Sequence, residues 1–251
     1  MTDSLLPSHV HIMVDLETWG LTPGSDIRSI GAVVFDPLAG TLGDEFYVNI
    51  SAVPSAIDYG LTRDASTIAW WVEQSAEAKQ LLMIDQVHIR IALARFADWW
   101  DEHQPEGTVT RFWAHGPHFD EAILQACYRA TGSTQPWSHR APRDCRTVWE
   151  LAGDFSIPFE GVEHNALDDA KHQARCVIEA YRRIRKPKGQ PTGFEVWQEP
   201  VNGQTMHSLK QIGGPYDNWE IATLDAYLTD CDEPAPDKRD FRQIVVRSVF
   251  A

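Results

Sequence analysis

Two acidic residues separated by one position are the feature of this sequence that most directly indicates chemistry. Asp15 and Glu17 follow the apolar start of the run HIMVDLETWG, which is typical of a buried strand ended by glycine and proline. Side chains at i and i+2 of a strand point the same way, so the two carboxylates converge while Leu16 and Thr18 face the opposite side. A divalent cation with oxygen ligands is the usual partner of such a pair. A strand end with solvated acids is the alternative explanation of this pattern alone.

A third acid, Asp120, lies in the stretch RFWAHGPHFDEAILQACYRA at residues 111–130. Residues 112–114 are typical of a short buried strand, 115–117 of a turn and 121–130 of a helix. Asp120 is therefore predicted near the N-terminus of that helix. A capping side chain, which stabilises a helix by about 1 kcal/mol, explains this position, and a ligand that joins the first two acids is the other explanation.

A fourth acid and a histidine occur together in EHNALDDAKHQARCVIEAYRRIR at residues 163–185. Apolar residues at helical spacing predict an amphipathic helix that begins near Asn165. Asp169 lies one turn from Ala166, next to the buried face, whereas Asp168 points about 100° away and is expected to be solvated. His164 directly precedes the helix, where a lone histidine is usually a polar loop residue.

The elements that must position these residues begin with three predicted strands, at 10–14, 29–35 and 45–50. The apolar run over 30–35 is typical of a central strand. Helices are predicted over 66–83 and 87–102, and then a strand over 111–114, a helix over 121–130, a short helix over 145–152 and the helix after His164. Three consecutive strands followed by mixed helices and strands predict an α/β fold, a mixed sheet with helices on both sides.

The order of these features resembles the DEDDh group of 3′–5′ exonucleases, which have a ribonuclease H-like fold. Three further stretches, 66–80, 143–147 and 164–174, are similar to the subgroup that contains the phage DexA-type exonuclease and ribonuclease AS. The similarity covers about residues 9–184. By this resemblance the general base is His164 and the metal-site acids are Asp15, Glu17, Asp120 and Asp169. One departure is Gly116, preceded by His115, where many members carry asparagine four residues before the third acid.

The resemblance implies hydrolysis of single-stranded nucleic acid from a free 3′ end to nucleoside 5′-monophosphates. Two Mg²⁺ or Mn²⁺ ions are implied as cofactors, because the ligands are all carboxylate oxygens. The stretch 66–80 favours DNA as the substrate, and a 3′–5′ exoribonuclease with the same site chemistry is the alternative. A catalytically silent nucleic-acid-binding protein is the rival outside the enzymes, since a fold alone does not give activity.

Aromatic side chains beside the predicted site are candidate platforms for nucleobases. Trp19 follows the first strand among turn residues, and we expect it to contact the substrate. Phe119, directly before Asp120, is interpreted either as a core residue or as a platform for a nucleobase. By the resemblance, Leu16 and Thr18 wedge beside the terminal nucleotide.

The composition predicts an intracellular globular protein. In 251 residues, 43% hydrophobic content and ten tryptophans exclude a disordered chain, and the four cysteines form no C-x-x-C pair. We expect a cytoplasmic location, because the sequence shows neither a secretory leader nor an apolar run of membrane-spanning length.

The net charge of −14 argues against a protein that coats or reads a duplex, because phosphate binding usually leaves a basic footprint. We therefore expect weak, salt-sensitive binding outside the active site. Four basic residues near the motifs are expected to steer the strand: Arg63, Arg143, Arg146 and Lys171.

The sequence predicts two parts, an exonuclease domain over 1–190 and a C-terminal extension over 191–251. The basic segment 182–193, which contains proline and glycine, closes the first part. A strand over 195–199, a helix over 218–228 and a strand over 241–250 predict a small α+β extension. About 60 residues make a small core, so we expect the extension to pack on the exonuclease or on a second subunit, and a homodimer is one possibility.

Overall fold

A computed structural model describes residues 9–51, 57–185, 193–198, 210–216 and 244–249. The chain divides into two compact units, residues 1–185 and 186–251. Among the described residues, no helix has both the length and the apolar character needed to cross a membrane. All the residues predicted to act in catalysis belong to the first unit.

The first unit is built on a five-stranded sheet with the strand order β3-β2-β1-β4-β5. The strands β1 (His9–Thr18), β2 (Ile27–Asp36) and β3 (Thr41–Asn49) form an antiparallel meander. β4 (Val109–Ala114) pairs parallel to β1, and the short β5 (Pro142–Asp144) pairs parallel to β4. The sheet is therefore mixed, as predicted, although β5 was not expected.

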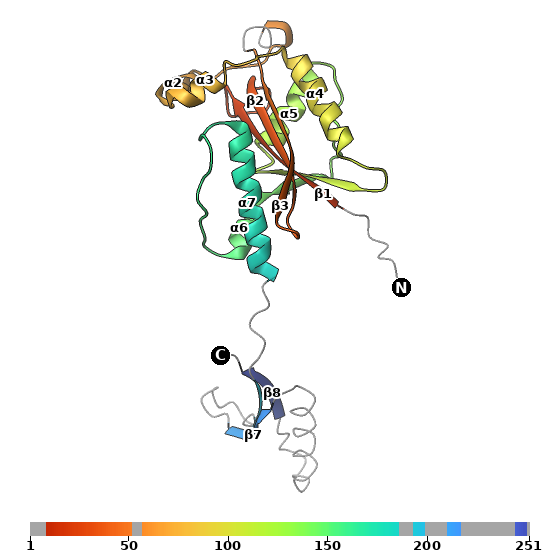
Figure 1. Cartoon of the computed structure of the whole chain (residues 1–251), viewed down its shortest axis with the longest axis vertical. Coiled ribbons are helices and arrows are strands. Elements are labelled where there is room, and N and C mark those ends of the chain that lie inside the picture. The colour runs from red at the N-terminus through yellow and green to blue at the C-terminus, as the bar shows by residue number, and fades with distance from the viewer. Residues whose placement is uncertain (1–8, 52–56, 186–192, 199–209, 217–243, 250–251) are drawn as a thin grey trace, which may run out of the picture. The chain divides into compact units, whose positions relative to one another are not determined.

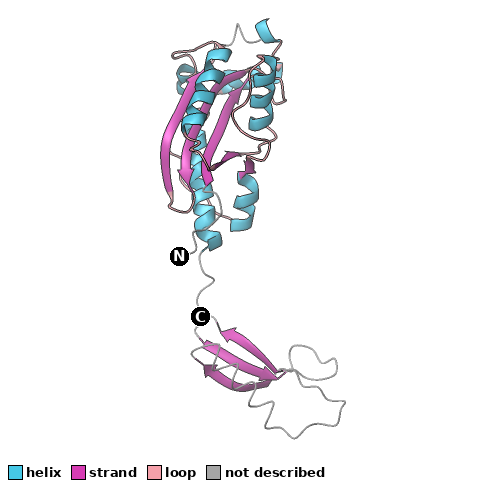
Figure 2. Cartoon of the chain, turned by 90° about the vertical axis from the view of Figure 1, so that its right-hand side faces the viewer, coloured by secondary structure: helices cyan, strands magenta, loops and turns pink. Residues whose placement is uncertain are grey.

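Helices cover both faces of this sheet (Figures 1 and 2). On one face α4 packs beside β3, and α5 packs beside β1 and β4; on the other, α7 crosses β1, β2 and β3 with α6 against it. The helices are α2 (Ala65–Glu73), α3 (Ala76–Leu81), α4 (Ile89–Glu102), α5 (Asp120–Ala130), α6 (Cys145–Ala152) and α7 (Ala166–Arg185).

The predicted single helix over 66–83 is instead two helices, α2 and α3. The break occurs because the Ser75 side chain accepts a hydrogen bond from the backbone N–H of Ala78 at 3.1 Å and starts a new helix. A serine in this position is a preferred N-cap. The difference leaves α2 as a short helix beside the end of β1.

Alternation along β1 divides its side chains between two cores. Ile12, Val14 and Leu16 enter the larger core, which α4 and α5 cover, whereas Met13 enters a smaller core with Ala174 and other residues of α7. Because the strand period is two, the residues that follow Met13 at the same phase, 15 and 17, also face α7. The acidic pair thus lies on the side of the sheet that α7 covers.

A glycine in β2 allows the start of α7 to approach this pair. Gly31 pairs with Asp15 across the β1–β2 ladder. A Cβ atom at Gly31 would overlap with the backbone of Ala166 and Leu167, so the first turn of α7 lies directly on the sheet at this point. This close approach places the first turn of α7 beside the end of β1.

The second unit contains a three-stranded antiparallel sheet with the order β7-β6-β8. Its strands are β6 (Gly193–Gln198), β7 (Lys210–Tyr216) and β8 (Ile244–Val249). β6 and β8 overlap the predicted strands, β7 was not predicted, and the helix predicted over 218–228 lies outside the described residues. The domain boundary at residue 190 and the packing of the extension stay predictions.

Candidate active site

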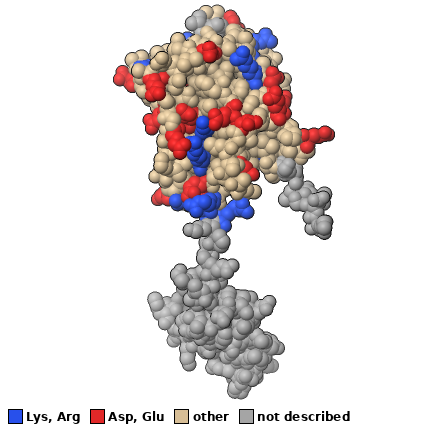
Figure 3. Space-filling view, in the orientation of Figure 1, with Lys and Arg blue, Asp and Glu red and all other residues tan. Residues whose placement is uncertain are grey.

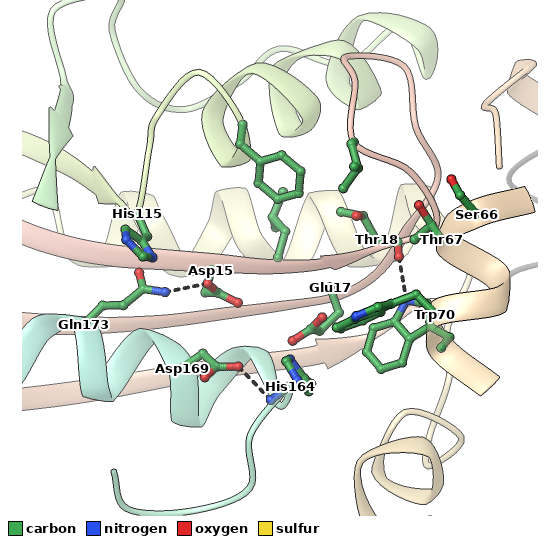
Figure 4. A pocket seen from close by; sticks show the side chains of 14 residues that line it. Asp15, Glu17, Thr18, Ser66, Thr67, Trp70, His115, His164, Asp169 and Gln173 are labelled. Carbon is green, nitrogen blue, oxygen red and sulfur yellow. Dashed lines mark hydrogen bonds between the residues drawn. The ribbon is translucent and has the colours of Figure 1, made fainter. Parts of the chain in front are cut away.

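A cavity of about 570 Å³ lies along the C-terminal half of β1 (Figure 4). Its walls come from β1 and the turn after it, from α2, from the loop after β4, and from α7 with His164, two residues before that helix. The lining residues are Asp15, Leu16, Glu17, Thr18, Leu21, Ser66, Thr67, Trp70, Trp71, His115, Phe119, His164, Asp169 and Gln173. The structure therefore brings together three of the four predicted acids and the predicted base.

The fourth acid, Asp120, lies behind the cavity wall with only 2% of its surface exposed. It is the first residue of α5, but its Oδ1 accepts a hydrogen bond from the backbone N–H of Leu16 in β1 at 3.2 Å. The N-cap residue of α5 is Phe119, so the interpretation of Asp120 as an N-cap is wrong. Its bond joins α5 to the acidic strand.

The four carboxylates share one poorly solvated region, and the pKa of each is raised. Burial is the largest cause: it raises the pKa of Glu17 to about 8, of Asp120 to about 7 and of Asp169 to about 6. The pKa of Asp15 is also well above its ordinary value, first through burial and then through repulsion from the other three acids. Such a group binds protons or cations strongly, and its all-oxygen donors suit a hard divalent cation.

Carboxylate oxygens of Glu17 and Asp169 and a ring nitrogen of His164 all lie within 4.8 Å of one another. Mg²⁺ and Mn²⁺ prefer oxygen to imidazole nitrogen, so this geometry suits His164 better as a proton acceptor than as a ligand. The backbone N–H of His164 donates to Asp169 Oδ2 at 2.9 Å. The His164 ring meets the Trp70 ring edge-on with 4.8 Å between centroids.

The backbone of His164 is unusual, with φ of 65°. A non-glycine residue in this left-handed region is uncommon, and such residues concentrate at functional sites. Directly after it, Asn165 caps α7 by accepting hydrogen bonds from the backbone N–H groups of Leu167 (3.1 Å) and Asp168 (3.2 Å). The cap and the bond to Asp169 hold the histidine at the cavity.

Asp168 is not simply solvated, contrary to expectation. Its Oδ2 accepts a hydrogen bond from the backbone N–H of Val162 at 2.9 Å, and its side chain fills the space where a Cβ of Gly161 would lie. It does not line the cavity. Asp168 therefore fastens the loop before α7, while its neighbour Asp169 faces the acids.

An arginine that sequence reasoning missed lies next to the acidic pair. Arg28 is 8% exposed, and its guanidinium carbon lies 4.0 Å from the Trp19 ring centroid and 4.1 Å from that of Trp71. Its charge acts on Glu17 and opposes the rise in the pKa of that carboxyl. Two aromatic faces stabilise a buried cation. An arginine two residues before the apolar run of β2 was the available signal.

The four predicted substrate contacts differ in their placement. Leu16 and Thr18 are buried at the cavity wall, and Thr18 Oγ1 donates to the carbonyl of Gly20 at 2.7 Å. Phe119 lines the cavity and packs on the larger core. Trp19 does not line the cavity, and its ring covers Arg28 instead.

Trp70 lines the cavity and exposes 44% of its surface. Its neighbour Trp71 is buried and donates from Nε1 to the carbonyl of Thr18 at 2.9 Å. The signal for Trp70 was the tryptophan pair itself: on a surface helix, adjacent residues point about 100° apart. One of the two must then face outward when the other is buried.

Three of the four basic residues expected to steer the strand are engaged elsewhere. Arg63 pairs with Asp26 and Lys171 with Glu45, each at 2.9 Å. Arg143 donates to backbone carbonyls, including that of Pro142 at 2.7 Å.

Arg146 lies closest to the cavity loop. A Cβ at Gly116 would lie against its guanidinium group, and its NH2 is 3.4 Å from His118 Nδ1. Its side chain stays half exposed beside Asp144 at 3.5 Å.

Charge on the face drawn in Figure 3 is mainly acidic, with basic side chains gathered where α7 ends. That last turn carries Arg182, Arg183 and Arg185.

A family model described as "3'-5' exoribonuclease Rv2179c-like domain" matches residues 10–181. No curated protein matches the sequence. Among solved structures, cell-death related nuclease 4 (CRN-4) is similar with a TM-score of 0.52 and 13% identity, covering 69% of this chain and 64% of that one. The zinc-ion-bound E. coli ExoI–ssDNA complex is similar with a TM-score of 0.51 and 12% identity, covering 76% and 48%. The chain thus spans 64% and 48% of these two structures, which share the ribonuclease H-like fold with it.

Proposed function

The chain belongs to the family of Rv2179c-like 3′–5′ exoribonuclease domains, which makes it a DEDDh-type 3′–5′ exonuclease, and we propose that it removes nucleotides one at a time from single-stranded RNA. The choice of RNA follows the description of the family model and reverses the preference for DNA expected from residues 66–80. DNA is the second candidate, because the solved ExoI complex of the same fold contains single-stranded DNA.

We assign two divalent ions, Mg²⁺ or Mn²⁺, to the four carboxylates of Asp15, Glu17, Asp120 and Asp169. The support is the donor chemistry: every candidate ligand is a carboxylate oxygen, and the mutual repulsion of buried acids is relieved when a cation is bound. When bound, two such ions supply the charge that makes a nucleophile from water and neutralises the leaving oxygen.

His164 is proposed to accept the proton of the attacking water. The support is its position within 4.8 Å of the Glu17 and Asp169 oxygens and the fixed orientation of its ring against Trp70. The water gives a proton to His164 as its oxygen bonds to the phosphorus of the last phosphodiester, the bond from that phosphorus to the 3′-oxygen breaks, and the 3′-oxygen takes a proton from solvent. The products are a nucleoside 5′-monophosphate and a strand one nucleotide shorter with a new 3′-hydroxyl.

The terminal nucleotide is proposed to lie between Leu16 and Thr18 on one side and the aromatic wall on the other. Phe119 remains a proposed contact, and Trp70 takes the stacking role expected of Trp19, because Trp70 is the exposed ring of the cavity. Arg146 is the proposed contact for a phosphate, since its charge is half exposed beside the cavity loop.

One observation carries this proposal: Asp15, Glu17, Asp169 and His164 line the same cavity, with Asp120 bonded directly behind its wall. A catalytically silent nucleic-acid-binding protein would not need this constellation. The homodimer and the role of residues 191–251 stay proposals. Sedimentation of the full chain, with and without a bound strand, measures the oligomeric state.

The test uses 5′-labelled RNA and DNA of one sequence, each ending in a 3′-hydroxyl or a 3′-phosphate, with Mg²⁺, Mn²⁺ or chelator. We expect stepwise shortening of free 3′ ends, release of 5′-monophosphates, faster digestion of RNA, and none in chelator. Equal or faster digestion of DNA would overturn the sugar assignment. Binding without digestion in every metal would favour the silent protein.

A further inference from the structure

Three of the site acids each accept a hydrogen bond on one carboxylate oxygen. Asp120 Oδ1 accepts from the backbone N–H of Leu16 at 3.2 Å, and Asp169 Oδ2 accepts from the backbone N–H of His164 at 2.9 Å. Asp15 Oδ1 accepts from a side chain, Gln173 Nε2, at 2.7 Å. The backbone donors are fixed by the fold, whereas the donor to Asp15 depends on one residue of the sequence.

Gln173 is placed for this bond by the phase of α7. It lies one turn after Asp169 and therefore on the same face of the helix. It is 7% exposed and lines the cavity. Its amide lies between Asp15 and His115 in Figure 4, with the amide oxygen on the side of His115.

The orientation of this amide follows from the chemistry of its partner. With a cation bound, Asp15 is ionised and only accepts hydrogen bonds, so the amide nitrogen of Gln173 faces it, as it does in this structure. The amide oxygen, Oε1, is buried and has no hydrogen-bond partner among the described residues. Leaving a buried acceptor unpaired is unfavourable, and the bond to Asp15 is what this orientation gains.

We propose that Gln173 is a positioning residue that holds Oδ1 of Asp15 and leaves Oδ2 available at the cavity. This inference rests on the proposed function, in which Asp15 holds divalent ions. A carboxylate on a strand rotates about its side-chain bonds, and its rotation must be restricted before it meets two ions in one geometry. Gln173 does for Asp15 what backbone N–H groups do for Asp120 and Asp169.

A matched control exists in α5. Gln125 Nε2 donates to Glu121 Oε1 at 3.4 Å, so this pair also joins a glutamine amide to a carboxylate. Its two residues lie one turn apart on the same helix. Neither residue lines the cavity. Gln125→Leu therefore removes a bond of the same kind outside the site.

The experiment compares Gln173→Leu, Gln173→Glu and Gln125→Leu in the full chain. Mn²⁺ affinity is measured by calorimetry, unfolding is followed in chelator, and kcat and KM are measured on a single-stranded oligonucleotide. We expect Gln173→Leu to bind Mn²⁺ about 10–100-fold more weakly and to lose kcat by a similar factor, with KM within about 2-fold. Excess Mn²⁺ should restore part of its turnover. Gln125→Leu should match the native protein.

Gln173→Glu keeps the size of the side chain but places an acceptor against Asp15, and we expect it to lose kcat as well. Native Mn²⁺ affinity and kcat in folded Gln173→Leu would overturn the proposal, and so would losses equal to those of Gln125→Leu. If Gln173→Leu does not fold, native behaviour of Gln173→Glu would overturn it. Because metal binding is measured directly, a chain that binds Mn²⁺ but digests no strand would fail the proposed function while still testing Gln173.

Discussion

The two faces of β1 differ in what they contribute. On one face Ile12, Val14 and Leu16 are buried in an apolar core under α4 and α5. On the other, the half-buried Asp15 and the buried Glu17 lie among further acids under α7, with raised pKa values. One strand thus stabilises the fold on one side and concentrates charge on the other. The comparison teaches that the charged face opposes folding until a cation or protons relieve the repulsion.

The strongest way to break this comparison is to substitute two acids on the α7 side of β1 and one apolar residue on its other side. Asp15→Asn and Asp169→Asn should each lower turnover by more than about 10³-fold and leave the chain folded, because each removes a proposed metal ligand. Ile12→Ala should cost about 2–5 kcal/mol of stability and change kcat by less than about 3-fold. Single-turnover rates and urea unfolding measure both. A dead, folded Ile12→Ala protein would contradict the division between the faces.

His164→Asn separates the proton acceptor from the metal site. Asparagine tolerates a positive φ and keeps the backbone N–H that Asp169 accepts. We expect kcat to fall by about 10²–10⁴-fold while Mn²⁺ affinity, measured by calorimetry, stays within about 3-fold. A folded variant with near-native kcat would mean that another group or solvent takes the proton.

Substituting Gly31 tests how α7 reaches the charged face. Gly31→Ala introduces a Cβ where the backbone of Ala166 and Leu167 lies, so the start of α7 must move. We expect a loss of about 2–4 kcal/mol in the free energy of unfolding, as for severe overpacking, and at least about 10-fold in kcat. Gly43→Ala in the neighbouring strand β3 is a matched control, since the nearest atom to a Cβ there is the Val34 carbonyl oxygen at 3.4 Å, an ordinary van der Waals distance. Equal losses for both would contradict the proposed role of Gly31.

The metal-free protein should lose stability as the pH rises. The folded-state pKa values of Asp169, Asp120 and Glu17 are raised to about 6, 7 and 8, above those of the unfolded chain near 4. Between these values the folded state binds more protons, so the stabilisation present below about pH 4 is lost as the pH rises through 6 to 8. We expect Tm in chelator to fall by roughly 5 °C or more from about pH 5 to about pH 8.5. Saturating Mn²⁺ should reduce that slope, and an unchanged slope would argue against a metal site among these acids.

The smallest effect is expected for Asp168→Ala. This substitution removes the bond to the backbone N–H of Val162, so it should cost about 1 kcal/mol and leave kcat within about 3-fold. Thermal unfolding and turnover of this variant, beside Asp169→Ala, check the helical phase. A dead Asp168→Ala and an active Asp169→Ala would show that the other acid faces the site.

Local periodicity was enough to predict several parts of this arrangement. The period of two in β1 predicted that Asp15 and Glu17 share a face, and the helical phase of α7 separated Asp169 from Asp168. Both predictions depend only on neighbours along the chain. The mixed α/β sheet followed from the order of the elements.

Contacts across the fold were beyond such reasoning. The stacking of Arg28 between Trp19 and Trp71, and the bond from Gln173 to Asp15, join residues 9 to 158 positions apart. The prediction that Trp19 stacks on a nucleobase was wrong for the same reason, because its ring packs on Arg28 from the next strand. Only the packing of α2 and α7 on the sheet reveals these partners.

The most direct test of the account is a titration of the metal-free full chain with Mn²⁺, in which ion binding and release of 5′-monophosphate from a single-stranded RNA are followed together. The account predicts that about two ions bind per chain, that turnover rises with their binding, and that Asp15→Asn loses both. Full turnover in excess chelator, or native ion binding by Asp15→Asn, would contradict the claim that the charged face of β1 is the metal site of this exonuclease.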